Sequence, residues 1–222
     1  MSSAAVARPQ TTQEHAVDWL RRAIVGGELR PGGRVTQEDV AARIGVSVGS
    51  VREALRVLEQ EGQLTYRARR GYFVTELRMA DLREIYELRE LLEGRAARRA
   101  LPALDAEAIA RLEQAAAECA HAAAIGDVTG ELAANRRFHF GLLEAPDGPH
   151  SMRVIKLLWD STEAYRALYY NAPQEREAAA AAHDRILDAV RAGDPDRLVA
   201  ELDAHRERAL RFLAGVLEPA GG

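Results

Sequence analysis

The residues from Thr36 to Leu58 constrain the fold of this chain more than any other stretch, because they describe two short helices joined by a tight turn. Thr36 can cap a first helix, and Gly45 can adopt the positive φ that such a turn requires. Ser47 or Ser50 can cap a second helix. The apolar residues of that helix recur at the spacing of one buried face: Val51, Ala54, Leu55 and Leu58. A helix-turn-helix places its second helix in the major groove of DNA, so the pattern predicts a DNA-binding unit.

The segments on either side complete a small domain. Residues 12–25 follow a helical period, and β-prone runs at 64–67 and 72–75 enclose a turn that carries Arg69 and Arg70. Three helices followed by a β-hairpin are typical of a winged helix-turn-helix, predicted here over residues 12–77, whose basic wing tip can approach phosphates or the minor groove. Residues 1–77 hold 11 arginines and 9 acidic residues, a balance of +2, whereas residues 78–222 carry −6.

Beyond residue 77 the sequence shows only helical patterns, separated by proline or glycine. They cover residues 81–101, 105–125, 128–144, 151–170, 174–192 and 196–217. Short connections favour antiparallel neighbours, so residues 78–217 are predicted to form an all-α antiparallel bundle of about six helices. The predicted fold class is therefore mainly α, with a flexible tail at 1–11 and a short tail at 218–222.

The composition limits the class of protein further. A chain of 222 residues is long enough for two modest domains. No apolar run approaches the roughly 18–20 residues of a membrane span, and residues 1–11 lack the apolar core of a signal peptide, so a cytoplasmic protein without membrane contact is expected. Because Cys119 is the single cysteine, no intramolecular disulfide can form.

Polar residues interrupt the apolar faces of several predicted bundle helices. They are Arg89 on the first, Asn135 and His139 on the third, His183 on the fifth and His205 on the sixth. Three histidines that enter a bundle interior from three helices can hold a divalent metal ion, with an amide or carboxylate oxygen as a further ligand. A single histidine on such a face is more often a core residue bonded to a carbonyl or carboxylate. Arg89 can equally pair with Glu93 one turn on.

Several stretches together resemble a known family. Residues 28–34 (ELRPGGR), 46–56, 59–62 (EQEG) and 69–74 (RRGYFV) resemble the winged-helix domain of GntR-type bacterial regulators. The second half resembles the FadR-like ligand-binding domain called FCD, in the run from Asp81 to Arg89, then in Asn135 to His139, Ala182-His183 and His205. The resemblance covers residues 12–215, and six helical patterns rather than seven suggest its shorter, VanR-like branch.

The resemblance implies a homodimer that binds a pseudo-palindromic DNA operator and responds to a small organic acid. In metal-containing members of the family, an acidic residue and three histidines hold a divalent ion, beside which the effector carboxylate binds. The matching positions are Asn135, His139, His183 and His205, with zinc as the first choice and nickel or manganese as alternatives. Arg89 is the implied partner of the effector carboxylate, because a guanidinium can bind it bidentately.

Two positions depart from the family pattern. Asn135 stands where aspartate is common, and its amide oxygen is a weaker, neutral ligand. Val48 stands where the family usually has arginine, the side chain best suited to guanine O6 and N7, so base reading is expected to depend on Arg52. The full set of expected DNA contacts is Ser47, Gly49, Ser50, Arg52, Arg56, Arg43, Arg69, Arg70 and Gly71. Each of these arginines can also be a plain surface charge.

These observations favour a ligand-responsive transcriptional regulator, and within that class a repressor. Two other classes stay open. One is a metal-dependent, hydrolase-like enzyme that uses the three histidines to activate water, and the other is a DNA-binding module whose bundle serves only dimerisation. Against the enzyme, the sequence has no His-Glu-x-x-His motif, nucleophile elbow or phosphate loop.

Overall fold

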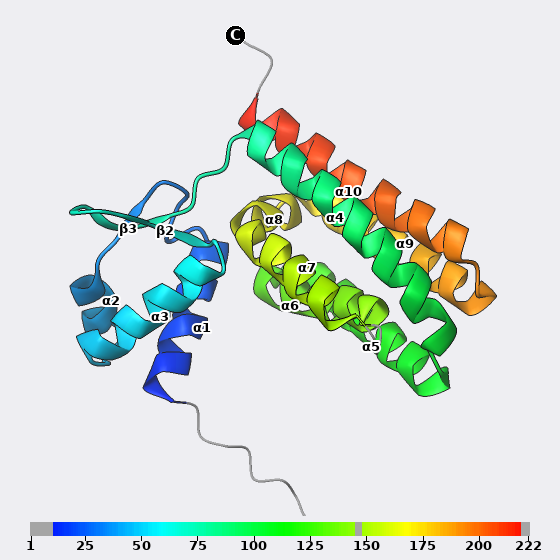
Figure 1. Ribbon diagram of the computed structural model, residues 1–222, viewed down its shortest axis with the longest axis horizontal. Coiled ribbons are helices and arrows are strands. Elements are labelled where there is room, and N and C mark those ends of the chain that lie inside the picture. The colour runs from blue at the N-terminus through cyan, green and yellow to red at the C-terminus, as the bar shows by residue number, and fades with distance from the viewer. Residues whose placement is uncertain (1–10, 145–147, 219–222) are drawn as a thin grey trace, which may run out of the picture. The chain divides into compact units, whose positions relative to one another are not determined.

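The structure, a computed structural model, describes residues 11–144 and 148–218. The chain divides between Thr75 and Glu76 into two compact units, coloured blue to cyan and green to red in Figure 1. The predicted tails at 1–11 and 218–222 lie almost wholly outside the described residues, as does part of the predicted break at 146–149.

The first unit consists of three helices and a small sheet. Its elements are α1 (Thr12–Val25), β1 (Arg34–Val35), α2 (Gln37–Ile44), α3 (Val48–Gln60), β2 (Leu64–Arg67) and β3 (Gly71–Val74). The strands are antiparallel in the order β1-β3-β2, so the predicted hairpin gains a third strand that the sequence analysis did not include. The predicted winged helix-turn-helix is confirmed.

Local sequence explains the helix-turn-helix. Gly45 ends α2 in the left-handed conformation, at a φ of 69° that costs glycine little. Ser47 caps α3, because its hydroxyl accepts the Ser50 backbone N–H at 3.1 Å, so Ser47 is the one used of the two predicted caps. Val51 and Leu55 are fully buried on the inner face of α3, which packs on α1. Each such burial stabilises the unit by roughly 1.5–3 kcal/mol.

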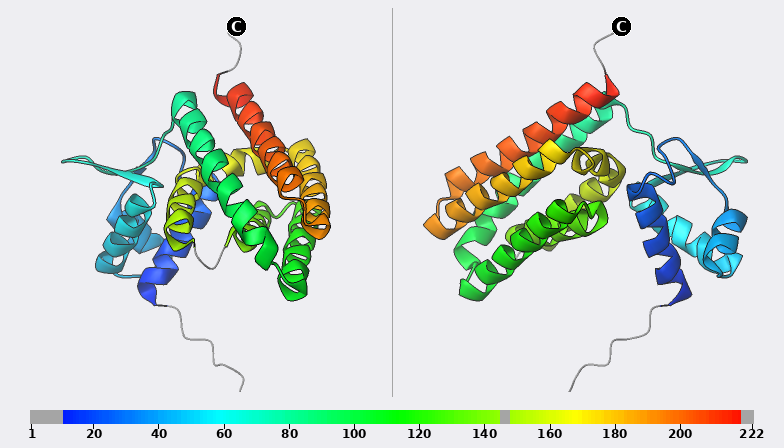
Figure 2. Two further views of the ribbon diagram at one scale, coloured as in Figure 1. Left: turned by 45° about the vertical axis from the view of Figure 1, so that its right-hand side comes forward. Right: turned by 180° about the vertical axis from the view of Figure 1, so that it is seen from behind.

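The second unit is a bundle of helices. Its described elements are α4 (Met79–Ala100), the 3-10 turn η1 (Leu101–Ala103), α5 (Ala106–Ile125), α6 (Val128–Leu143), α7 (Pro149–Ser161), α8 (Glu163–Tyr170), α9 (Pro173–Ala192) and α10 (Pro195–Leu217). Helices α4 and α10 lie side by side, and α9 lies beside α10 (Figures 1 and 2). Helix α5 packs on both α6 and α9. The predicted all-α bundle, and with it a mainly α fold class, is confirmed.

The fourth predicted helix of the bundle is divided into two, α7 and α8, at Thr162. The backbone of Thr162, at φ −105° and ψ 6°, is not helical. Its hydroxyl donates to the carbonyl oxygens of Leu158 and Trp159, each at 3.2 Å, and so competes with the helical hydrogen bonds that would continue α7. The described part of the second unit therefore holds seven α-helices, and the VanR-like branch, which six suggested, is not confirmed.

The core of the bundle contains an unusual group of polar side chains. Large apolar residues such as Phe138, Ile155 and Ile186 form its main part. Buried beside them are Arg89, Glu93, Asn135, His139, Arg166, His183, His205 and Arg206. Because buried polar groups are costly unless they are paired or bound, this group marks the place to look for a site. None of the described helices combines the length and hydropathy that crossing a membrane would require.

Candidate functional site

Three helices bring the three predicted histidines together. His139 lies on α6, His183 on α9 and His205 on α10, and their ring centroids are 5.3, 5.4 and 5.5 Å apart. One ring nitrogen of each lies within 4.8 Å of the others. All three side chains are buried. The spacing allows a single ion to contact all three rings after small side-chain adjustments.

Asn135 lies one turn before His139 on α6 and belongs to the same cluster. Its Oδ1 is 3.0 Å from Nε2 of His183. Four buried ring nitrogens have no hydrogen-bond partner among the described residues, namely both nitrogens of His139 and Nδ1 of His183 and of His205. Buried polar atoms are normally satisfied, so unpartnered nitrogens in a cluster of three close imidazoles fit a bound metal ion.

Burial keeps these imidazoles neutral. It lowers the pKa of His183 to about 4. At His139 and His205, burial together with the neighbouring histidines and Arg89 holds the pKa well below its ordinary range. A neutral ring can offer a lone pair to a metal without first losing a proton, so the cluster is in the ligand-competent state at neutral pH.

A buried network of charges borders the histidines. Glu93 accepts hydrogen bonds from Arg89 Nε at 2.7 Å, from Arg206 Nη1 at 2.6 Å and from Trp159 Nε1 at 2.7 Å. Burial alone would raise the pKa of Glu93, but the two arginines outweigh it and hold the pKa below its ordinary value. The predicted alternative for Arg89, an ion pair with Glu93, is therefore present. Its guanidinium also lies over the Trp159 ring, 4.4 Å from the centroid.

A cavity of about 20 Å³ lies at the centre of these groups, lined by Arg89, Asn135, His139, His205 and residues of α8. This volume holds one ion or water molecule and excludes an organic acid. Arg166, Arg206 and Trp159 also line it, and the sequence analysis did not select them. Arg206 follows His205 directly, a usable signal, and Arg166 lies seven residues after Trp159, a spacing that puts two residues on one helical face.

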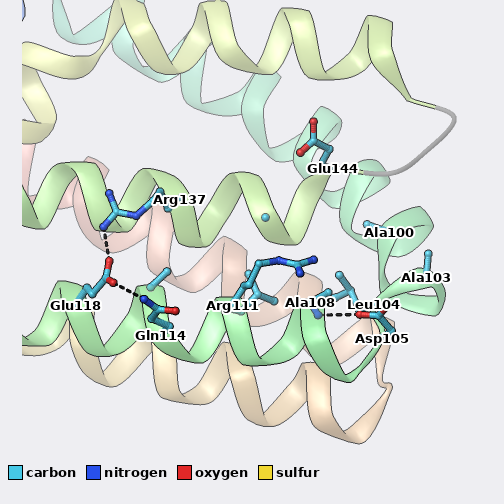
Figure 3. Close-up of a pocket in the computed structure, with 13 residues that line it drawn as sticks. Ala100, Ala103, Leu104, Asp105, Ala108, Arg111, Gln114, Glu118, Arg137 and Glu144 are labelled. Carbon is cyan, nitrogen blue, oxygen red and sulfur yellow. Dashed lines mark hydrogen bonds and ion pairs between the residues drawn. The ribbon is translucent and has the colours of Figure 1, made fainter. Parts of the chain in front are cut away.

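A larger hollow, of about 480 Å³, lies elsewhere on the bundle, along α5 and α6 (Figure 3). Two of its charged groups, Arg137 and Glu118, pair with each other. Arg137 donates to Glu118, which also accepts from Gln114, and Asp105 caps α5 through the backbone N–H of Ala108. The hollow contains none of the predicted site residues.

Helix α3 and its N-cap carry five of the nine expected DNA contacts. Arg52 and Arg56 are exposed and lie 3.6 and 3.2 Å from Glu53, in surface pairs that are weak and easily replaced by phosphate. Val48, in the first turn, is 42% exposed. The hydroxyl of Ser50 lies 3.0 Å from that of Ser47, which caps the helix. Gly49 lies between these two serines, and Arg43 on α2 pairs with Glu28.

The wing presents a second basic surface in the first unit. Arg69 and Arg70 are exposed at the tip between β2 and β3, and Gly71 at the start of β3 has a φ of 91°. Arg69 itself has a positive φ of 61°, which projects the tip outward at some local strain. Arg67 and Arg70 lie over the Phe73 ring at 4.6 and 5.8 Å, so the ring holds two cations beside the tip.

Comparisons with known proteins agree with this architecture. Residues 12–74 match the family model of bacterial regulatory proteins, gntR family, and residues 84–208 match that of the FCD domain. The chain is 29% identical over 200 residues to "Uncharacterized HTH-type transcriptional regulator YdhC" of Bacillus subtilis (strain 168), which covers 90% of this chain and 89% of the relative. It is 31% identical over 188 residues to "Probable D-xylose utilization operon transcriptional repressor" of Paenarthrobacter nicotinovorans, which covers 84% and 81%.

A solved structure shares the fold across both units. "E. coli McbR/YncC" superposes with a TM-score of 0.81 over 93% of this chain and 98% of that chain, at 24% sequence identity. The winged helix-turn-helix and the bundle define the class of bacterial transcriptional regulators, not enzymes. The chain belongs to the GntR family and carries an FCD domain.

Proposed function

We propose that this protein is a ligand-responsive repressor that binds a pseudo-palindromic operator as a homodimer and releases it when a small organic acid binds near a divalent metal ion in the bundle. The observation that carries the proposal is the cluster of His139, His183 and His205, which brings three imidazole nitrogens within 4.8 Å of one another in a chain that also has a winged helix-turn-helix. The D-xylose relative is named a probable operon repressor, and this name supports the direction of regulation.

A face of the second unit supports dimerisation. Four large apolar side chains on α4 and α7, two helices that pack together, are exposed: Leu88, Leu91, Val154 and Leu157. Leu91 is the most exposed, at 71%. Exposed apolar residues gathered on adjacent helices are typical of a self-association surface. A two-fold dimer would present two copies of α3 to two half-sites, which is why the operator is proposed to be pseudo-palindromic.

On the DNA side, the proposed base-reading residue is Arg52, supported by its exposure on α3. Ser47, Gly49 and Ser50 are proposed to lie close to the groove, and Arg43 and Arg56 to bind phosphates. Arg69, Arg70 and Gly71 form the proposed wing contact with phosphate or the minor groove.

The metal ion is proposed to be held by His139, His183 and His205, with Asn135 as the fourth ligand. Three imidazole nitrogens favour zinc, with nickel and manganese as alternatives. When bound, the ion supplies a Lewis-acid centre for an effector carboxylate. Arg89 is proposed to orient that carboxylate from the cavity wall, although its Nε is engaged by Glu93.

Effector binding is proposed to change the shape of the bundle. The cavity of about 20 Å³ cannot admit an organic acid unless its lining residues on α4, α8 and α10 move apart. An acid that binds the widened arrangement more tightly than the closed one shifts the population toward the widened arrangement. The size of the shift depends on the ratio of the two affinities. The proposed consequence is a dimer whose two winged helices no longer fit the operator spacing.

Metal analysis and DNA binding of the full-length chain test this proposal together. Wild-type protein should hold about one divalent ion per chain, and His183→Ala should lose it, because three-nitrogen coordination falls to two. His121→Ala, which removes an exposed histidine from α5, is the matched control and should retain the ion. A stoichiometry near zero in wild type would instead support a bundle that serves only dimerisation.

The DNA measurement uses the region upstream of the protein's own gene. Wild-type protein should bind it selectively, with an affinity that falls as salt rises. Absence of selective, salt-dependent binding on that region would contradict the proposed operator.

A further inference from the structure

Arg166 on α8 is a buried cation with donors to spare. Its Nη2 donates to the Trp159 carbonyl and to Glu163, each at 3.2 Å, whereas its Nε and Nη1 are buried without a partner. The residue is only 5% exposed and lines the same cavity as His139 and His205. A buried guanidinium with unpaired nitrogens is costly. Nε–H and Nη1 face different edges of the planar group, so a carboxylate can accept one charge-assisted hydrogen bond from either of them, but not from both at once.

The other two buried arginines differ from Arg166 in their charge balance. Arg89 and Arg206 share the fully buried carboxylate of Glu93. The acidic partner of Arg166 is Glu163, which is partly exposed and also lies 3.7 Å from Arg136. Burial accordingly lowers the pKa of Arg166, whereas the pair with Glu93 outweighs burial and raises the pKa of Arg89. Of these three cations, Arg166 is the one whose charge is least compensated within the protein.

Trp159 connects Arg166 to the histidine cluster. The Arg166 guanidinium lies 4.3 Å from the centroid of the Trp159 ring, and the His139 ring lies 5.2 Å from it. Both groups therefore contact one indole, close enough for the two ends of a short ligand to reach them. The histidine site also favours a negatively charged group of a ligand, because three neutral imidazoles and the Asn135 amide leave the charge of a divalent ion uncompensated.

We propose that Arg166 binds a second carboxylate of the effector, so that the ligand of this cavity in its widened arrangement is a short dicarboxylate, with one end at the histidine cluster and the other on an unpaired N–H group of Arg166. This inference rests on the proposed function and assigns its ligand class. Arg166 then selects between ligands, because a monocarboxylate bound at the histidine cluster leaves the buried guanidinium without a carboxylate partner in the cavity.

The test measures binding of three pairs of acids of equal chain length to the zinc-loaded, full-length protein. The pairs are malonate with propionate, succinate with butyrate, and glutarate with valerate. Calorimetry gives the affinities, and fluorescence in a Trp19→Phe background reports on Trp159, the other tryptophan of the chain. At least one dicarboxylate should bind at least about tenfold more tightly than the monocarboxylate of the same chain length. This comparison is made with Arg166 unchanged.

Two substitutions then locate the second carboxylate. Arg166→Met should reduce the preference for the dicarboxylate to less than about twofold while affinity for the monocarboxylate is unchanged. Arg166→Lys keeps the charge but loses the planar guanidinium and its fixed donor directions, and it should give an intermediate preference. Arg185→Met is the matched control, because it removes an arginine from the exposed side of α9 that pairs with Glu201, and it should keep the full preference. Zinc content and circular dichroism verify that each variant is folded.

The outcomes separate this inference from the function on which it rests. Equal binding of both acids in every pair, or a preference that persists in folded Arg166→Met, overturns the assignment of Arg166 but leaves an acid-responsive regulator intact. If none of the six acids binds the zinc-loaded protein or changes its affinity for DNA, both the acid effector and the dicarboxylate assignment are overturned.

Discussion

Glu131 on α6 offers a sharp test of how burial controls charge in this bundle. Its side chain is 0% exposed, and neither carboxylate oxygen has a hydrogen-bond partner among the described residues. Burial raises its pKa from an ordinary 4.5 to about 7, against a lowering effect of Arg176 and with a smaller raising effect of Asp127. The carboxylate therefore destabilises the folded protein once it is ionised. We expect Glu131→Gln, which cannot ionise, to relieve that penalty.

The magnitude and sign follow from proton linkage. Between about pH 4.5 and 7 the folded protein keeps a proton on Glu131 that the unfolded chain releases, so this group's contribution to stability falls as pH rises through that window. The full penalty, present above pH 7, corresponds to about 3 kcal/mol. The free energy of unfolding of Glu131→Gln, relative to wild type, should thus rise by roughly 2–3 kcal/mol between pH 5 and pH 8.

Urea unfolding followed by helical circular dichroism, with a chelator present, measures this difference. The histidine titrations are common to both proteins and cancel when the two are subtracted. Glu107→Gln on α5 is the matched control, because that side chain is 84% exposed, and its effect should stay within about 0.5 kcal/mol at both pH values. A difference between Glu131→Gln and wild type that is the same at pH 5 and pH 8 would refute the reasoning.

Three further predictions concern the DNA-binding and association surfaces. Arg52→Ala should cost about 1–3 kcal/mol in operator affinity and relax sequence preference at one position, measured by anisotropy on single-base operator variants; a uniform loss on all variants would make it a phosphate contact. Val48→Arg should strengthen preference for guanine-containing half-sites, and an unchanged preference in the same assay would mean that Val48 lies away from the bases. Leu91→Glu should dissociate the proposed dimer in sedimentation experiments, whereas Glu87→Gln, an exposed change on the same helix, should not.

Much of the fold could be predicted from the sequence because it is decided locally. The helix at 12–25 was predicted with the bounds of α1. The turn between α2 and α3 could be located because Gly45 adopts a positive φ and the hydroxyl of Ser47 caps α3. The periodic spacing of apolar residues also placed Asn135, His139, His183 and His205 on inward faces. These features depend on residues within one or two helical turns, so short-range chemistry determines them.

Other features depend on contacts between distant segments. The role of Arg89 could not be chosen from the sequence alone. Its partner Glu93 also accepts hydrogen bonds from Arg206 and Trp159, which lie on two other helices, and the sequence does not show that these residues come together. Strand β1 has two residues and exists only because it pairs with β3.

The histidine cluster shows where the two kinds of information meet. The sequence by itself determined that each histidine lies on the buried face of its own helix, since the helical period fixes which residues share a face. Only the tertiary structure decided that these three faces meet, and that His139 and His205 share one small cavity with Arg166. The reason is that a helix fixes the direction of its side chains relative to its own axis, whereas the positions of the axes depend on packing across the whole bundle.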